Sequence, residues 1–94
     1  MITYDHVSEM KLRLKIFHDV EDDHIQNLLE QSYEDLSRRC NFHDMEDLLA
    51  KELVFERTRY AYNDSLEFFN TNFLSQIMTL SLLNMDVIDD DNSI

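Results

Sequence analysis

The sequence predicts an all-α protein, a small bundle of about four helices followed by an acidic C-terminal tail. The chain contains no glycine and no proline. Those residues supply most tight hairpin turns, so their absence disfavours a β-rich fold. Apolar residues recur three or four positions apart along most of the chain, which is the spacing of one helix face. Without glycine, the left-handed ends of helices are expected at Asn41, Asn63 and Asn70.

The first helix is expected over about residues 4–15. Thr3 or Asp5 can cap its N-terminus by accepting hydrogen bonds from free backbone N–H groups. Its apolar face consists of Tyr4, Val7, Met10 and Leu14. These positions are three or four residues apart and predict a short amphipathic helix.

The second helix is expected to begin near Glu21 and to end at Cys40. The acidic residues 21–23 place negative charge at its N-terminus, where the helix dipole favours it. Arg38 and Arg39 place positive charge at the opposite end, which is also favourable. Its apolar face consists of Ile25, Leu28, Leu29, Ser32, Tyr33, Leu36 and Cys40.

The third helix is expected to open with a capping arrangement of Asp44 and Asp47, three residues apart, and to run to about Tyr62. One apolar face consists of Leu48, Leu49, Leu53 and Tyr60. A second apolar face consists of Val54, Phe55 and Tyr62. One core needs only one such face, so we expect the second to contact a neighbouring subunit. The predicted core includes Leu28, Leu29, Leu36, Leu49 and Leu53.

The chain after the third helix is expected to hold a link, a last helix and the tail. Residues 63–65 interrupt the helical pattern, and residues 66–70 form a turn of helix or an irregular link. Thr71 or Asn72 can cap the last helix. Its apolar residues are Phe73, Leu74, Ile77, Met78, Leu80 and Leu83. We therefore expect one helical domain over residues 1–85 and a charged tail over residues 86–94.

The charge balance and the hydropathy exclude several classes of function. The chain carries 8 Lys+Arg against 20 Asp+Glu, a formal net charge of −12. Tight binding to nucleic acid depends on neutralising phosphates and is therefore not expected. No apolar run approaches the roughly 18 residues of a membrane-spanning helix. The N-terminus lacks a signal-peptide pattern and the single cysteine cannot form an intrachain disulfide, so we expect a protein made in the cytoplasm.

No catalytic or metal-binding motif is complete in the sequence. Cys40 and His43 have the spacing of half a zinc site, but there is no matching second half. The same pair lacks a third group that would orient a nucleophile and its base. Asp19, Asp22 and Asp23 lack the glycine and the terminal glutamate of an EF-hand loop. We therefore expect no enzymatic activity, no cofactor and no metal.

Lys11, Arg13 and Lys15 form the main basic cluster. In so acidic a chain, we expect these cations to pair with carboxylates of a neighbouring subunit rather than with phosphates. The predicted subunit interface therefore consists of Lys11, Arg13, Lys15, Val54, Phe55 and Tyr62.

Four segments of the chain carry a resemblance to a known family. The first two are Val7-x-x-Met10-Lys11-x-x-Leu14-x-Ile16, and Glu21-Asp22-Asp23 followed by Ile25-x-x-Leu28-Leu29-x-x-Ser32-Tyr33. The other two are Arg59-Tyr60-x-Tyr62-Asn63-Asp64-x-Leu66-Glu67-Phe68-Phe69 and Asn72-Phe73-x-Ser75-x-Ile77-x-x-Leu80. In their order and spacing they resemble the small head-tail connector proteins of tailed bacteriophages, also called head-completion or adaptor proteins. The family's glycine and proline turns are absent here.

The resemblance implies a structural protein of the virion neck. It implies a homo-oligomeric ring, commonly a dodecamer, that docks on the portal protein and continues the DNA channel towards the next neck or tail-completion protein. Genomic DNA would pass through the acidic lumen without tight binding. Portal or neck contacts are expected from Phe68, Phe69, Phe73, Asp89, Asp90 and Asp91. The alternative is a small acidic DNA-mimic inhibitor of a host nucleic-acid enzyme, acting as a monomer or dimer.

Overall fold

The computed structural model describes residues 1–85, and this part of the chain is all-helical, with no strand. Its elements are α1 (Tyr4–Leu14), α2 (Asp22–Cys40), α3 (Leu48–Tyr62), the 3₁₀ helix η1 (Leu66–Phe68), α4 (Phe69–Asn72) and α5 (Leu74–Leu83). The predicted all-α fold and the three long helices are confirmed. The predicted link over residues 66–70 is one 3₁₀ turn followed by one short helix. The predicted tail over residues 86–94 lies outside the described residues.

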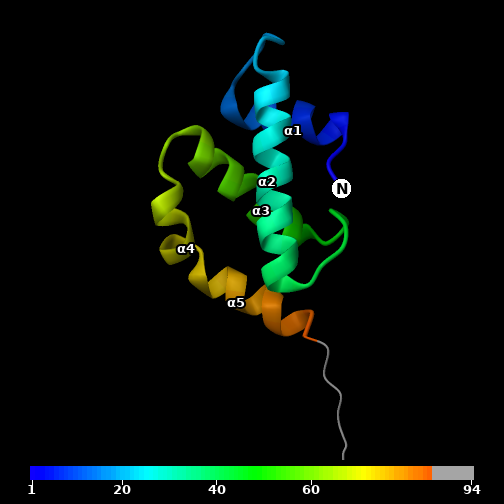
Figure 1. Cartoon of the computed structure of the whole chain (residues 1–94), viewed down its shortest axis with the longest axis vertical. Helices are drawn as coiled ribbons and strands as arrows, with labels where there is room; N and C mark the ends of the chain where they lie inside the picture. The colour runs from blue at the N-terminus through cyan, green and yellow to red at the C-terminus, as the bar shows by residue number, and fades with distance from the viewer. Residues whose placement is uncertain (86–94) are drawn as a thin grey trace, which may run out of the picture.

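α2 is the longest helix and forms the axis of the fold (Figure 1). α3 crosses α2 and packs against it, α1 crosses its N-terminal half, and α5 packs against its C-terminal end. The short elements η1 and α4 return the chain from the end of α3 to the start of α5 (Figure 1). This arrangement leaves the connection between α1 and α2 at one end of the molecule and α5 at the other.

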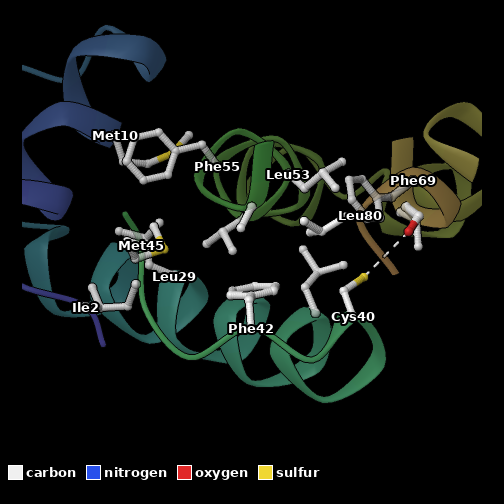
Figure 2. Packing of buried hydrophobic residues seen from close by; sticks show 14 of the residues in the cluster. Ile2, Met10, Leu29, Cys40, Phe42, Met45, Leu53, Phe55, Phe69 and Leu80 are labelled. Carbon is white, nitrogen blue, oxygen red and sulfur yellow. Dashed lines mark hydrogen bonds between the residues drawn. The ribbon is translucent and has the colours of Figure 1, made fainter. Parts of the chain in front are cut away.

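The core is one continuous cluster of buried side chains (Figure 2). It extends from Ile2, Met10 and Met45 beside α1 to Phe69 and Leu80 beside α5. Of the five leucines predicted for the core, the structure buries Leu29, Leu36 and Leu53 completely or almost completely. The other two, Leu28 and Leu49, are only partly buried.

The prediction that α3 exposes a second apolar face is wrong. Val54 and Phe55 are fully buried within the chain. The reason is that α3 has neighbours on several sides, since α2, α5, η1 and α4 all pack against it. On the remaining side Phe55 meets α1, where the Arg13 guanidinium lies 4.7 Å from its ring centroid. The apolar circumference of α3 therefore reflects a central position in its own domain.

Two single residues predicted to lie in apolar faces are instead exposed. Leu48, the first residue of α3, is 80% exposed. Tyr4 occupies the corresponding first position of α1 and is 68% exposed. Ile2, which precedes α1, is buried and closes that end of the core.

The helix ends show which polar residues replace glycine. Asp47, the second residue of the predicted capping pair, is itself the N-cap of α3, and its side chain accepts hydrogen bonds from the N–H groups of residues 49 and 50 at 2.8 and 3.2 Å. Asn41 ends α2 with a φ of 59°, which confirms one predicted left-handed position. The other two were wrong, because the remaining left-handed residues among positions 1–85 are Lys15 and Asp64. The predicted candidates are instead a C-cap with negative φ at Asn63 and a member of α4 at Asn70.

Candidate interaction surfaces

One side of α5 is both apolar and exposed. Ile77 and Leu80 are buried in the core, while a second set of apolar residues on α5 and just after it faces solvent. This set, which we call the α5 stripe, consists of Leu74, Met78, Leu82 and Met85. Spacings of four, four and three residues align these side chains along one helix face, and each is more than half exposed. α5 contains no charged residue, so no charge interrupts the stripe.

Polar contacts fix α5 to the C-terminal end of α2. The buried thiol of Cys40 donates to the Ile77 carbonyl oxygen, with an Sγ–O distance of 3.7 Å (Figure 2). The Ser81 hydroxyl lies 3.4 Å from that sulfur. Asn41 Nδ2 donates to the Asn84 carbonyl oxygen at 3.0 Å. Because these contacts hold the inner face of the helix, the orientation of the α5 stripe is set by the fold.

The loop between α1 and α2 presents a second apolar surface. Phe17 and Val20 are 81% and 88% exposed, and we call this pair the loop patch. The loop is held from inside by Lys11, whose Nζ lies 2.9 Å from Asp19 Oδ1 and 2.7 Å from Asp22 Oδ1. Hydrogen bonds to these two carboxylates raise the pKa of Lys11 and keep it charged. The loop patch therefore projects from a braced loop.

The two apolar surfaces lie at opposite ends of the molecule. The loop patch precedes the N-terminus of α2, and the α5 stripe lies beside its C-terminus (Figure 1). A helix of 19 residues separates them, a length of about 28 Å. One copy of the chain therefore cannot bring its own two surfaces together, whereas two copies can.

Two of the three cations predicted to pair with a neighbouring subunit form ion pairs within their own chain. Lys11 braces the loop, and Arg13 forms a two-pronged contact with Glu52, with N–O distances of 2.9 and 3.1 Å. This hydrogen bonding lowers the pKa of Glu52. Lys15, in contrast, is the exposed C-cap of α1. Lys11 and Arg13 therefore pair with carboxylates of their own chain rather than standing free for a neighbour.

The remaining residues of the predicted subunit interface are also occupied within the chain. Val54 and Phe55 belong to the core, as described above. Tyr62 is partly buried, and its hydroxyl donates to Glu21 Oε1 at 2.9 Å, which ties the end of α3 to the start of α2. Accepting this hydrogen bond, Glu21 raises the pKa of Tyr62.

The aromatic residues predicted to contact a portal mostly hold the short helices in place. Phe69 is fully buried and stacks on Phe73, with ring centroids 5.1 Å apart. Tyr60 meets both rings edge-on, at 5.9 and 5.6 Å. Only Phe68 of the predicted trio is exposed. The other predicted contact residues, Asp89, Asp90 and Asp91, lie outside the described part of the chain.

The described residues offer no assembled site for metal chemistry. No group of three or more His, Cys, Asp or Glu side chains within residues 1–85 could hold a metal ion. The half-motif noted in the sequence is split, because Cys40 is buried against α5 while His43 is exposed. Among the same residues, no helix is both long enough and apolar enough to cross a bilayer.

Comparisons with protein-family models, with curated proteins and with solved structures found no match.

The α5 stripe and the loop patch were not among the residues predicted to make contacts. The signal for the stripe is present in the sequence, because residues 74–83 combine apolar residues on two sides with no charge. The signal for the loop patch is weaker, since Phe17 and Val20 are two apolar residues in an otherwise polar link. Their exposure follows from the position of α1 against α2.

Proposed function

We propose that this chain is a structural, non-enzymatic subunit that assembles into a homo-oligomeric ring, as head-tail connector proteins do in the neck of tailed phages. The observation that carries the proposal is the pair of different apolar surfaces at opposite ends of the molecule. Two copies joined through two different surfaces form a heterologous contact, and such contacts close into rings when the rotation between subunits permits. A single self-complementary surface would instead favour a closed dimer.

In this proposal the loop patch of one subunit packs on the α5 stripe of the next. Phe17 supplies a large rigid ring, and Met78 and Met85 supply flexible side chains that adapt to it. Burying apolar surface contributes roughly 25 cal/mol per Å², so these residues dominate the affinity. The virion neck is the proposed location, with a portal protein and the next neck or tail-completion protein as partners.

The acidic character of the chain suits a wall along which DNA moves. Subunits of net charge −12 repel phosphates wherever their carboxylates face a channel. The same charge would suit the alternative, an inhibitor that mimics DNA. Seven of the eight Lys and Arg side chains form ion pairs within residues 1–85, all except Lys15. These pairs neutralise carboxylates that DNA mimicry would need free, which favours the ring.

The proposal is tested by the mass of the full-length protein, measured by native mass spectrometry over a range of concentrations. We expect a ring-sized species for the wild type and monomers for Phe17→Asp and for Met78→Asp. Both sites are exposed, so both variants should retain the helical content of the wild type. Tyr4→Asp is the control, because this residue is exposed outside both surfaces and should leave assembly intact.

Two results would contradict the proposal. Assembly of both variants at wild-type concentrations would show that these surfaces are not the subunit contact. A wild-type protein that remains a monomer or dimer at all concentrations, alone and with a portal ring, would favour the inhibitor.

A further inference from the structure

A pocket where α2, α3 and α4 meet gathers two guanidinium groups around one carboxylate. Its volume is about 270 Å³, and it is lined by Asp35, Arg39, Arg57, Leu66, Phe69 and Asn70. Arg39 Nη2 lies 3.0 Å from Asp35 Oδ2, and Arg57 Nε lies 3.2 Å from the same oxygen atom. Two positive charges against one negative charge leave one positive charge in excess. This is unusual on a chain whose net charge is −12.

The two arginines are held in place by further contacts that do not use all their donors. Arg57 Nη1 donates to Ser32 Oγ at 3.1 Å, and Arg39 Nη2 donates to Asn70 Oδ1 at 3.1 Å. The Arg57 side chain is only 17% exposed, so its position is fixed. A guanidinium group has five N–H donors. Within the described residues, Arg57 Nη2 and Arg39 Nη1 donate no hydrogen bond, which leaves donors for a further acceptor.

We propose that this pocket binds a carboxylate and that the carboxylate comes from the tail of the same chain, from Asp89, Asp90 or Asp91. Carboxylates match the planar guanidinium group and accept two parallel hydrogen bonds from it. Four of the nine residues that follow Met85 are aspartates and none is Lys or Arg, so the tail offers several carboxylates and no competing cation. The inference concerns a single copy of the chain and does not rest on the proposed ring.

The tail starts close enough to reach the pocket. The carbonyl oxygen of Asn84 accepts a hydrogen bond from Asn41, which fixes the end of α5 beside the end of α2. Asp35 precedes Asn41 by six residues, about 9 Å along a helix. An extended chain covers up to about 3.5 Å per residue, so Asp89 can lie about 14 Å from Met85. A tail of this length has an effective concentration on the order of millimolar at its own pocket.

The test uses the full-length protein in NMR spectra that resolve the side-chain N–H groups. Neutralising the tail with Asp89→Asn, Asp90→Asn and Asp91→Asn should shift the Nε–H resonances of Arg39 and Arg57. Asp5→Asn, Asp23→Asn and Glu46→Gln together form the matched control. They change the net charge by the same amount at exposed positions outside the pocket and should leave these resonances unchanged. Added salt should shift the two arginine resonances in the wild type but not in the tail variant.

A second variant separates binding from a general change of electric field. In Arg39→Gln the pocket loses its excess charge, so neutralising the tail should then no longer shift the Arg57 resonance. Equal shifts from the tail variant and from the control would overturn the proposal, as would no shift from either. Shifts that grow with protein concentration would assign the carboxylate to another copy and refute binding within one chain. An equal response of the wild type and the tail variant to inorganic phosphate would identify a general anion site and overturn the assignment to the tail.

Discussion

His6 is a single side chain whose role depends on its protonation state. It occupies the third position of α1, and its Nδ1 accepts a hydrogen bond from the Thr3 backbone N–H at 3.0 Å. Burial, followed by the nearby charge of Lys51, lowers the pKa of His6 below its ordinary value of 6.5. A neutral ring is required for this contact, because a protonated Nδ1 can no longer accept the hydrogen bond. The start of α1 is therefore sensitive to acid.

Acidification should destabilise the wild type more than His6→Gln. The folded pKa is lower than the unfolded pKa, so the unfolded chain binds the proton more readily. Stability is then fully present above the unfolded value near 6.5 and declines as pH falls through it towards the folded pKa. Glutamine at this position can still accept the Thr3 hydrogen bond but does not titrate. Thermal unfolding between about pH 7.5 and 5.5 measures the difference. A parallel decline of both proteins would contradict the assignment.

α3 shows how an element can follow the rules of periodicity and still be misinterpreted. Its position in the sequence and its Asp47 cap were predictable, because both depend on neighbouring residues. Its two apolar faces were visible as well. Whether a face meets the chain's own helices or another molecule depends on packing between segments far apart in the sequence. Phe55 is covered by Arg13 of α1, 42 positions earlier, so periodicity alone could not show its burial.

Phe55→Ala should lower the free energy of unfolding by about 3–5 kcal/mol, because it removes a fully buried ring from the centre of the core. Leu48→Ala, also on α3, should change it by no more than about 0.5 kcal/mol, because Leu48 is exposed. Denaturant unfolding of both variants measures the two values. A small loss at Phe55 would place that ring outside the core and restore the predicted second face.

The same limit explains which parts of the candidate site were predictable. The helical order and the acidity follow from local pattern and composition, and both were read correctly from the sequence. The partners of the basic cluster were not, because Arg13 and its partner Glu52 are 39 positions apart. The left-handed position at Lys15 had no local signal either, since lysine has no special preference for it. Exposure of the α5 stripe depends on which side of α5 meets α2.

At the level of the whole molecule, the two apolar surfaces differ, and each is proposed to bind the other kind on a neighbouring copy. This head-to-tail contact gives a prediction that a self-complementary contact does not. Phe17→Asp destroys the loop patch but keeps the α5 stripe, and Met78→Asp does the reverse. Each variant alone should be monomeric. A mixture of the two should form a heterodimer that cannot grow, because only one intact pair of surfaces remains.

Native mass spectrometry of this mixture, with one variant isotopically labelled, identifies the species by mass. A self-complementary contact through the stripe would instead give homodimers of Phe17→Asp. Raising the salt concentration should strengthen the heterodimer, because it screens the repulsion between two chains of net charge −12.

Because Cys40 lies beneath α5, the rate at which its thiol is alkylated reports how often α5 separates from α2. A thiol reacts with alkylating reagents only as an accessible thiolate, and this thiol is fully enclosed beneath Ile77 and Ser81. Its modification must therefore wait until α5 lifts away from α2, so the labelling rate counts those openings. No other cysteine competes for the reagent. Any partner that binds the outer face of α5 would lower the alkylation rate of Cys40 without touching the sulfur atom.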